Sequence, residues 1–188
     1  MEKQLIYVLD RDGTIIYDKD YLSDPSKIEF IPGAIEALLM LQNNKIPWII
    51  ASNQAGIAKG IISMEDLNRV NDRFIYLLNE YGVDIPPIKY CPHDYNGHVP
   101  PYNINCDCRK PCIGLVTSVY SDISKYNFVT IGDRWSDIML GHNLNGISCL
   151  VRTGYGINQE YEIIKMGIKA EYVCDDLLEA VMTTIDRT

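Results

Sequence analysis

Apolar and polar positions along the chain alternate in blocks that predict β-strands and α-helices in turn. Short continuous runs of apolar, mostly β-branched residues predict strands that are buried on both faces. Apolar residues spaced three and four positions apart predict helices with one buried face. Strands are expected over residues 5–9, 47–51, 87–90, 128–131, 147–151 and 170–173. Helices are expected over residues 34–43, 63–81, 113–124, 160–166 and 175–185, with another that ends near residue 143.

This alternation predicts a single α/β domain over residues 1–188. When strands and helices follow one another in this way, the strands form a parallel sheet with right-handed crossovers. We therefore expect a three-layer, Rossmann-like sheet with helices on both faces. The chain has no stretch long enough for a separate cap domain, and it shows no internal repeat or low-complexity segment.

Two carboxylates follow the first predicted strand directly, in the stretch Asp10-Arg11-Asp12-Gly13. Residues two apart on a strand face the same side, so Asp10 and Asp12 could share one crevice. One carboxylate could then attack an electrophile while the other moves protons, and the pair would attract Mg²⁺. An ordinary turn is the alternative, because Asp and Gly are frequent in turns.

Further polar residues follow the second and fourth predicted strands. The loop from Ser52 to Gly60 offers a hydroxyl, amides and backbone N–H groups to an anion, although an ordinary polar loop has the same composition. Asp133 could be an active-site acid, a helix N-cap or both, and Asp137 could lie on the same face four positions later. Parallel sheets collect the ends of their strands at one edge, so we expect these groups to converge there.

The most specific spacing lies in residues 91–108, where Cys91 and His93 precede Cys106 and Cys108. Three thiolates and one imidazole complete a closed tetrahedral site for a structural zinc ion. Free thiols or a disulfide are the alternatives, but clustered cysteines in a reducing compartment favour a metal. The zinc would hold together a loop that is rich in Pro, Asn, Tyr and Gly.

Two cations, Arg109 and Lys110, follow this cluster directly, which indicates that their position is fixed and that Lys110 could lie near the first carboxylate. Two solvated charges are the alternative. Cys112 is close enough in sequence to compete as a zinc ligand. Otherwise Cys112, Cys149 and Cys174 are expected to be small buried apolar residues.

The formal net charge of −8 argues against nucleic-acid binding through a broad basic surface. No apolar run approaches membrane-spanning length, and residues 1–4 lead directly into the first strand without room for a signal peptide. We therefore expect a cytoplasmic monomer that binds neither nucleic acid nor membranes. Cations within the loops of an acidic protein suit a small phosphorylated metabolite.

The order of these motifs resembles that of the haloacid dehalogenase (HAD) superfamily, through Asp10-x-Asp12-Gly13-Thr14, Ser52, Lys110 and Gly132-Asp133-x3-Asp137. A closer resemblance rests on the stretch Ser52-Asn53-Gln54-x-Gly56-Ile57-Ala58-x-Gly60 and on the Cys-x-His…Cys-x-Cys-Arg-Lys-Pro block. Both are similar to the D-glycero-D-manno-heptose 1,7-bisphosphate 7-phosphatases and the related histidinol-phosphatases, and the heptose phosphatases are the more similar.

The resemblance implies a magnesium-dependent phosphomonoesterase that acts on a phosphorylated sugar through an aspartyl-phosphate. It implies that Asp10 is the nucleophile, that Asp12 is the general acid and base, and that Ser52 and Lys110 hold the phosphoryl oxygens. Magnesium would be bound by the Asp10 carboxylate, the Asp12 backbone carbonyl and Asp133, with Asp137 supporting them. The residues implied in substrate binding are Asp18, Tyr21, Asn53, Arg109 and Arg134.

Two other classes of protein have similar features. A phospho-accepting domain of the response-regulator kind is also parallel α/β, but Asp12 argues against it because a second acid promotes loss of the phosphoryl group. A zinc-bound interaction domain with an inactive site is opposed by the complete set of acids, hydroxyl and lysine. The sequence departs from the family pattern at Asp20, at Cys112-Ile113 and at Arg134-Trp135, which bears on the substrate rather than on the chemistry.

Overall fold

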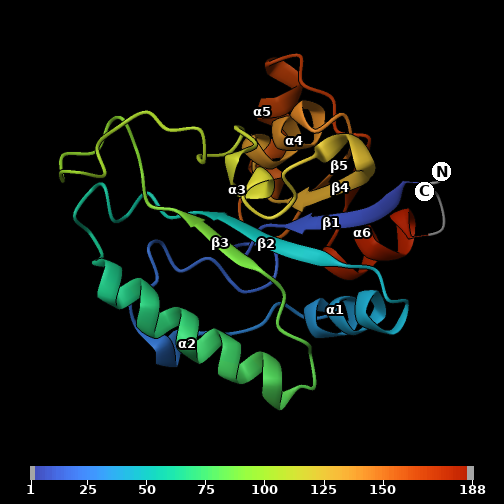
Figure 1. Ribbon diagram of the computed structural model, residues 1–188, viewed down its shortest axis with the longest axis horizontal. Coiled ribbons are helices and arrows are strands. Elements are labelled where there is room, and N and C mark those ends of the chain that lie inside the picture. The colour runs from blue at the N-terminus through green and yellow to red at the C-terminus, as the bar shows by residue number, and fades with distance from the viewer. Residues whose placement is uncertain (1–2, 186–188) are drawn as a thin grey trace.

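The computed structural model describes residues 3–185, which form a six-stranded parallel sheet between two layers of helices (Figure 1). The strands lie in the order β3-β2-β1-β4-β5-β6, and every neighbouring pair is parallel. Their bounds are β1 Gln4–Leu9, β2 Trp48–Asn53, β3 Ile88–Cys91, β4 Tyr126–Gly132, β5 Ile147–Val151 and β6 Tyr172–Cys174. This is the doubly wound order, so the three-layer Rossmann-like prediction is confirmed.

The helices divide between the two faces of the sheet according to the alternation of side chains along β1. Tyr7 and Leu9 point into one core with α1 and α6, whereas Ile6 and Val8 point into the other with α3 and α4. Both faces of the strand are therefore buried, as its continuous apolar sequence predicts. The helices are α1 Ala34–Asn43, α2 Met64–Glu80, α3 Gly114–Thr117, α4 Trp135–Asn143, α5 Gly156–Lys165 and α6 Leu177–Thr184, with 3₁₀ turns η1 Pro25–Lys27 and η2 Ile123–Lys125.

Most predicted elements are found, and the capping box expected at Ser63 and Asp66 begins α2. The prediction of one helix over residues 113–124 is wrong, because only the four residues of α3 and the turn η2 are helical there. The Asp122 carboxylate accepts hydrogen bonds from the amide and hydroxyl of Ser124, and this local bonding competes with a continuing helix. Helix α5 begins four residues before the predicted start at residue 160.

Strand β2 extends two residues beyond the prediction, so Ser52 and Asn53 belong to the strand and not to the loop after it. The predicted domain extends over residues 1, 2 and 186–188, and the prediction that there is no signal peptide also concerns residues 1 and 2. These positions lie outside the described residues. Within residues 3–185, no helix combines the length and the apolar character needed to cross a membrane.

Candidate active site

The carboxyl ends of β1 and β4 meet at the centre of the sheet, where the order of strands reverses, and Asp10 lies at this point. Its backbone N–H donates to the carbonyl of Ile131 in β4 at 3.0 Å, which continues the pairing of the two strands. Its carboxylate is buried and accepts from the N–H of Arg11 at 2.8 Å. Burial raises the pKa of Asp10 to about 6, because the lowering by Lys110 is offset in part by Asp137 and Asp12.

Lys110 lies between two carboxylates, with its Nζ 3.0 Å from Asp10 Oδ1 and 2.6 Å from Asp137 Oδ1. Burial alone would lower the pKa of Lys110, but the two carboxylates outweigh it and hold the pKa above its ordinary value. Asn53 fixes the backbone at this position. Its Nδ2 donates to the Lys110 carbonyl at 3.1 Å, and its Oδ1 accepts from the Lys110 N–H at 3.0 Å. Because Asn53 is the last residue of β2, these two hydrogen bonds fix the backbone of Lys110, a loop residue, against that strand.

Asp12 lies beside Asp10, within hydrogen-bond distance of residues at the end of β2. Asp12 Oδ2 accepts from Gln54 Nε2 at 2.7 Å and from Ser52 Oγ at 3.3 Å. The guanidinium of Arg11 also contacts both oxygens of this carboxylate. The predicted convergence of the β1 and β2 ends is therefore found.

Asp133 follows β4 and is enclosed by two glycines. Added side-chain atoms at Gly13 or at Gly154, both with positive φ, would collide with its carboxylate. The N–H of Tyr155 donates to Asp133 Oδ2 at 2.8 Å, and the hydroxyl of Thr153 ties the two loops together by donating to the Gly13 carbonyl at 2.6 Å. The N-cap alternative for Asp133 is wrong, because Arg134 occupies that position of α4.

Three buried carboxylates, those of Asp10, Asp133 and Asp137, lie close enough to share a metal ion, with Lys110 as the cation among them. Burial and the other two carboxylates raise the pKa of Asp133 to about 8. Its Oδ1 has no hydrogen-bond partner among the described residues. An unpaired buried oxygen and an excess of negative charge fit a hard divalent cation, for which carboxylates are the preferred ligands.

A cavity of about 700 Å³ opens above these groups and is lined by Asp10, Asp12, Ser52, Lys110 and several loop residues. One part of its rim is a network between the loop after β1 and the exit of β5. Arg134 Nη2 donates to Asp18 Oδ2 at 3.3 Å and its guanidinium lies 3.9 Å from the centre of the Tyr155 ring. The Tyr155 hydroxyl donates to Asp20 Oδ1 at 2.6 Å.

A second part of the rim joins the loop after β2 to the loop after β1 and to the long loop after β3. Lys59 Nζ donates to the Tyr21 hydroxyl at 2.9 Å, and it lies 3.9 Å from the carboxylate of Asp94. Arg109 reaches the same carboxylate at 3.4 Å and donates to the carbonyl of His93 at 3.0 Å. All five predicted substrate-binding residues, Asp18, Tyr21, Asn53, Arg109 and Arg134, line the cavity.

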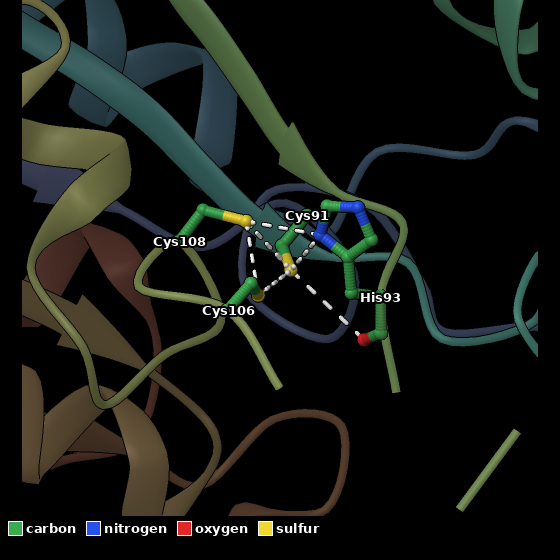
Figure 2. Close-up of side chains that lie close together, drawn as sticks. All are labelled: Cys91, His93, Cys106 and Cys108. Carbon is green, nitrogen blue, oxygen red and sulfur yellow. Dashed lines mark hydrogen bonds between the residues drawn. The ribbon is translucent and has the colours of Figure 1, made fainter. Parts of the chain in front are cut away.

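The three cysteines and the histidine predicted as zinc ligands form one cluster (Figure 2), of which Cys106 lines this cavity. Cys108 Sγ lies 3.1 Å from Cys91 Sγ, 3.2 Å from Cys106 Sγ and 3.3 Å from His93 Nδ1. Two zinc ligands in a tetrahedron lie about 3.5–3.8 Å apart, whereas a disulfide requires about 2.05 Å. The disulfide alternative is therefore wrong, because all the cysteines are free. The set of donors suits a tetrahedral metal ion, and Cys91 Sγ has the expected spacing, at 3.5 Å from Cys106 Sγ and 3.8 Å from His93 Nδ1, whereas the distances from Cys108 are shorter.

The remaining cysteines differ from one another. Cys149 and Cys174 are buried as predicted, but the prediction that Cys112 is buried is wrong, because the chain turns it outward into the rim of the cavity. Cys112 also lies outside the cluster of four ligands. The cluster loop does not depend on metal alone, because the N–H groups of His98 and Val99 donate to the Ala58 carbonyl at 2.9 and 3.0 Å.

Sequence reasoning did not identify several residues of this site. Gln54 contacts Asp12, Asp94 joins two rim cations, and the segment Thr153 to Tyr155 encloses Asp133. The segment Thr153 to Tyr155 could have been found from its sequence, because Gly154 and Gly156 lie directly after a predicted strand. Gln54 lies in the polar loop that the sequence pointed to, but neither it nor Asp94 carried a signal for its partner, because those partners come from distant parts of the chain.

The doubly wound sheet, with two acids after β1, a hydroxyl at the end of β2, a buried lysine and an acid after β4, defines a hydrolase of the HAD class. A family model described as HAD-hydrolase-like matches residues 107–180. Two relatives named D-glycero-beta-D-manno-heptose-1,7-bisphosphate 7-phosphatase, from Photorhabdus laumondii and Vibrio cholerae, are 35% and 34% identical. The alignment with the Photorhabdus protein covers 82% of this chain and 84% of that protein. The alignment with the Vibrio protein covers 87% of this chain and 89% of that protein.

A solved structure of a D,D-heptose 1,7-bisphosphate phosphatase from B. bronchiseptica, complexed with magnesium and phosphate, shares the fold with a TM-score of 0.80. It is 26% identical, and the alignment covers 98% of this chain and 99% of that one. The chain belongs to the family of the D-glycero-beta-D-manno-heptose-1,7-bisphosphate 7-phosphatases, within the HAD superfamily.

Proposed function

We propose that this protein is a magnesium-dependent phosphatase that removes the 7-phosphate of D-glycero-beta-D-manno-heptose 1,7-bisphosphate. The observation that carries the proposal is the convergence of Asp10, Asp12, Ser52 and Lys110 on one cavity. The names of the relatives support the substrate, and the magnesium and phosphate of the B. bronchiseptica structure support the cofactor and the reaction.

In the first step the Asp10 carboxylate attacks phosphorus, and the bond between phosphorus and the ester oxygen breaks. Asp12 gives its proton to the departing alkoxide, which leaves as the sugar hydroxyl. Lys110 Nζ, 3.0 Å from the nucleophile, and the Ser52 hydroxyl hold the phosphoryl oxygens as charge develops on them.

In the second step a water molecule attacks the phosphorus of the aspartyl-phosphate. Asp12, now ionised, takes a proton from that water, the bond between Asp10 and phosphorus breaks, and inorganic phosphate leaves. Asp10 is restored as a carboxylate and Asp12 as an acid, so the residues return to their starting state after one ester has been hydrolysed.

The residues that would bind magnesium are Asp10, Asp133 and the backbone carbonyl of Asp12. The unpaired Oδ1 of Asp133 supports this assignment. When bound, the ion supplies neutralisation of the phosphate and of the nucleophile. Asp137 would not bind the ion itself but holds neighbouring residues in place, because its two oxygens contact Lys110 Nζ and the N–H of Arg134.

We assign recognition of the rest of the substrate to Asp18, Tyr21, Asn53, Arg109 and Arg134, which line the cavity. The cationic side chains suit a bisphosphate, and the acids suit sugar hydroxyls. The amide of Asn53 is bonded through both its atoms to the Lys110 backbone, so its contribution includes positioning of that lysine.

We assign a structural zinc ion to Cys91, His93, Cys106 and Cys108. A closed set of four ligands leaves no coordination position for a substrate. The cluster ends one residue before Arg109, so its function is to fix Arg109 and Lys110. A single domain over residues 1–188, a monomeric state and a cytoplasmic location remain predictions of the sequence.

The test is release of phosphate from the heptose bisphosphate and from histidinol phosphate, measured side by side as kcat/KM with and without Mg²⁺. We expect a large preference for the bisphosphate and no turnover without the ion. Asp10→Asn, which keeps the shape of the nucleophile, is expected to abolish turnover. Full activity of that variant would refute the mechanism, whereas poor turnover of both substrates with activity on another phosphate ester would refute the substrate alone.

A further inference from the structure

Arg11 is the largest fully buried side chain among the described residues, with none of its surface exposed, and the mechanism above leaves it without a role. It stands between the two acids that act on the substrate. Arginine is rarely buried unless its charge is paired, because removal of the guanidinium from water is costly. A buried arginine between two reacting groups therefore requires an explanation from its contacts.

The guanidinium is fixed by contacts on three sides. Its Nε and Nη2 lie 2.9–3.3 Å from the two oxygens of Asp12, in the forked geometry that arginine forms with carboxylates. Its Nη1 donates to Asn71 Oδ1 in α2 at 2.7 Å. Its Cζ lies 5.4 Å from the centre of the Tyr90 ring in β3. Arg11 is thus held by two elements, α2 and β3, that contribute nothing to the chemistry.

The two oxygens of Asp12 are not equivalent. Oδ2 accepts from Arg11, from Gln54 at 2.7 Å and from Ser52 at 3.3 Å. Oδ1 has Arg11 as its hydrogen-bond partner within residues 3–185 and keeps a lone pair for a group in the cavity. The Asp12 side chain is 18% exposed and lines that cavity.

We propose that Arg11 is a positioning residue that, together with Gln54, holds Asp12 so that Oδ1 faces the leaving oxygen and transfers its proton. The inference rests on the proposed function and deepens it. No cap domain covers the cavity within the described part of the chain, so the acid has to be oriented from the sheet side. A side chain anchored to α2 supplies that orientation before the substrate arrives.

The test uses two phosphate esters whose leaving groups differ in their need for a proton. The sugar alkoxide of the heptose bisphosphate has to be protonated as it leaves, whereas 4-nitrophenolate leaves as a stable anion. The value of kcat/KM reports the first phosphoryl transfer and not the later hydrolysis of the aspartyl-phosphate. A poorly oriented acid therefore slows the sugar ester selectively, and a general structural defect slows both esters alike.

For Arg11→Met we expect kcat/KM for the sugar ester to fall by roughly 100-fold or more, within the range for general acid catalysis. The value for 4-nitrophenyl phosphate is expected to change by less than about 5-fold, because that reaction does not use this proton. Arg11→Lys keeps the charge without the forked geometry and is expected to recover only part of the loss.

Asn71→Leu tests the same inference without removing a buried charge. It deprives Arg11 Nη1 of its acceptor, and we expect a selective loss of roughly 10-fold on the sugar ester. Asn68→Leu, at an exposed position of the same helix, is the matched control and is expected to leave both rates unchanged. If Arg11→Met does not fold, the pair of asparagine variants decides the question.

Equal losses on the two esters in folded variants of Arg11 and Asn71, or no loss on either, would overturn the inference and leave the proposed function intact. A wild-type protein that hydrolyses neither ester in the presence of Mg²⁺ would overturn the proposed function, and the inference with it.

Discussion

The replacement of Gly154 by alanine tests how closely the loop after β5 encloses Asp133. Gly154 has a φ of +55°, and a Cβ built on it would collide with Asp133 Oδ2 and lie 2.6 Å from Gly13 Cα. Both neighbours are held in place, because the Gly13 N–H donates to the Ile16 carbonyl at 2.8 Å, the Gly13 carbonyl accepts from the Thr153 hydroxyl at 2.6 Å, and Asp133 is fully buried. Gly154→Ala therefore introduces a backbone cost and a steric cost at one position.

The two costs can be separated with a second glycine. A left-handed backbone costs a non-glycine residue about 1–2 kcal/mol, and overpacking adds about 1–3 kcal/mol, so Gly154→Ala is expected to lower the free energy of unfolding by about 2–5 kcal/mol. Gly167 follows α5 with a φ of +69° and nothing within 4 Å of its added Cβ. Gly167→Ala therefore has the backbone cost alone, about 1–2 kcal/mol.

Thermal unfolding and magnesium binding are the measurements. At roughly 2–4 °C per kcal/mol for a chain of this size, Gly167→Ala should lower Tm by about 2–8 °C and Gly154→Ala by about 4–20 °C. Displacement of Asp133 should also weaken Mg²⁺ binding and lower kcat by up to about 100-fold, because small misplacements of reacting groups are costly. Equal Tm shifts with unchanged Mg²⁺ affinity and kcat in both variants would refute this account of the glycine pair.

The geometry of the site leads to four further predictions. Asn53→Leu should lower kcat by about 10–100-fold because it releases the Lys110 backbone, and should raise KM because Asn53 also lines the substrate cavity; an unchanged kcat would contradict the positioning of Lys110 by Asn53. Cys106→Ser should lose the metal that wild-type protein retains in elemental analysis, and with it most of the activity, while Cys112→Ser keeps both because Cys112 is outside the cluster; equal zinc content in the two variants would contradict the assignment. Metal-free protein should lose stability as pH rises from about 4 to about 8, because Asp133, with its pKa raised to about 8, binds more protons when folded than when unfolded. Mg²⁺ affinity should weaken as pH falls through the same range, since binding needs the ionised carboxylates; calorimetry in buffers of different ionisation enthalpy will detect the released proton, and its absence at pH 7 would contradict the raised pKa.

The local elements of this fold could be predicted because their signals are local. Runs such as residues 147–151 are apolar throughout, which suits a strand covered on both faces, and the observed bounds of β5 are the same. The spacing of Cys91, His93, Cys106 and Cys108 is also a local property, since ligands two residues apart can face one metal ion. The prediction of a helix over residues 113–124 was wrong for a related reason. The apolar spacing of a helix was present, but the local hydrogen bond from Ser124 to Asp122 competes with helix formation.

The part of the site that could be predicted is the part that follows from one rule, namely that the carboxyl ends of parallel strands lie at one edge of the sheet. That rule brought the carboxylates after β1 and β4 together, and the pairing of these strands places Asp10 beside Ile131. It could not supply Gln54, Asn53 or Asp94 as positioning groups, because a polar loop residue has no periodicity to reveal its partner. It likewise gave no reason to expect a buried Arg11 between the two acids.

Local patterns in the sequence were enough to predict the succession of strands and helices along the chain, the acids that follow the strands and the donors that suit zinc. Tertiary structure alone decided which of those groups meet. Lys110 reaches Asp10 because Asn53 holds its backbone, and Asp133 is enclosed because Gly13 and Gly154, far apart in the chain, lie against each other. The physical reason is that hydrophobic patterning fixes which face of an element is buried, whereas contacts between loops depend on the packing of all the elements that carry them.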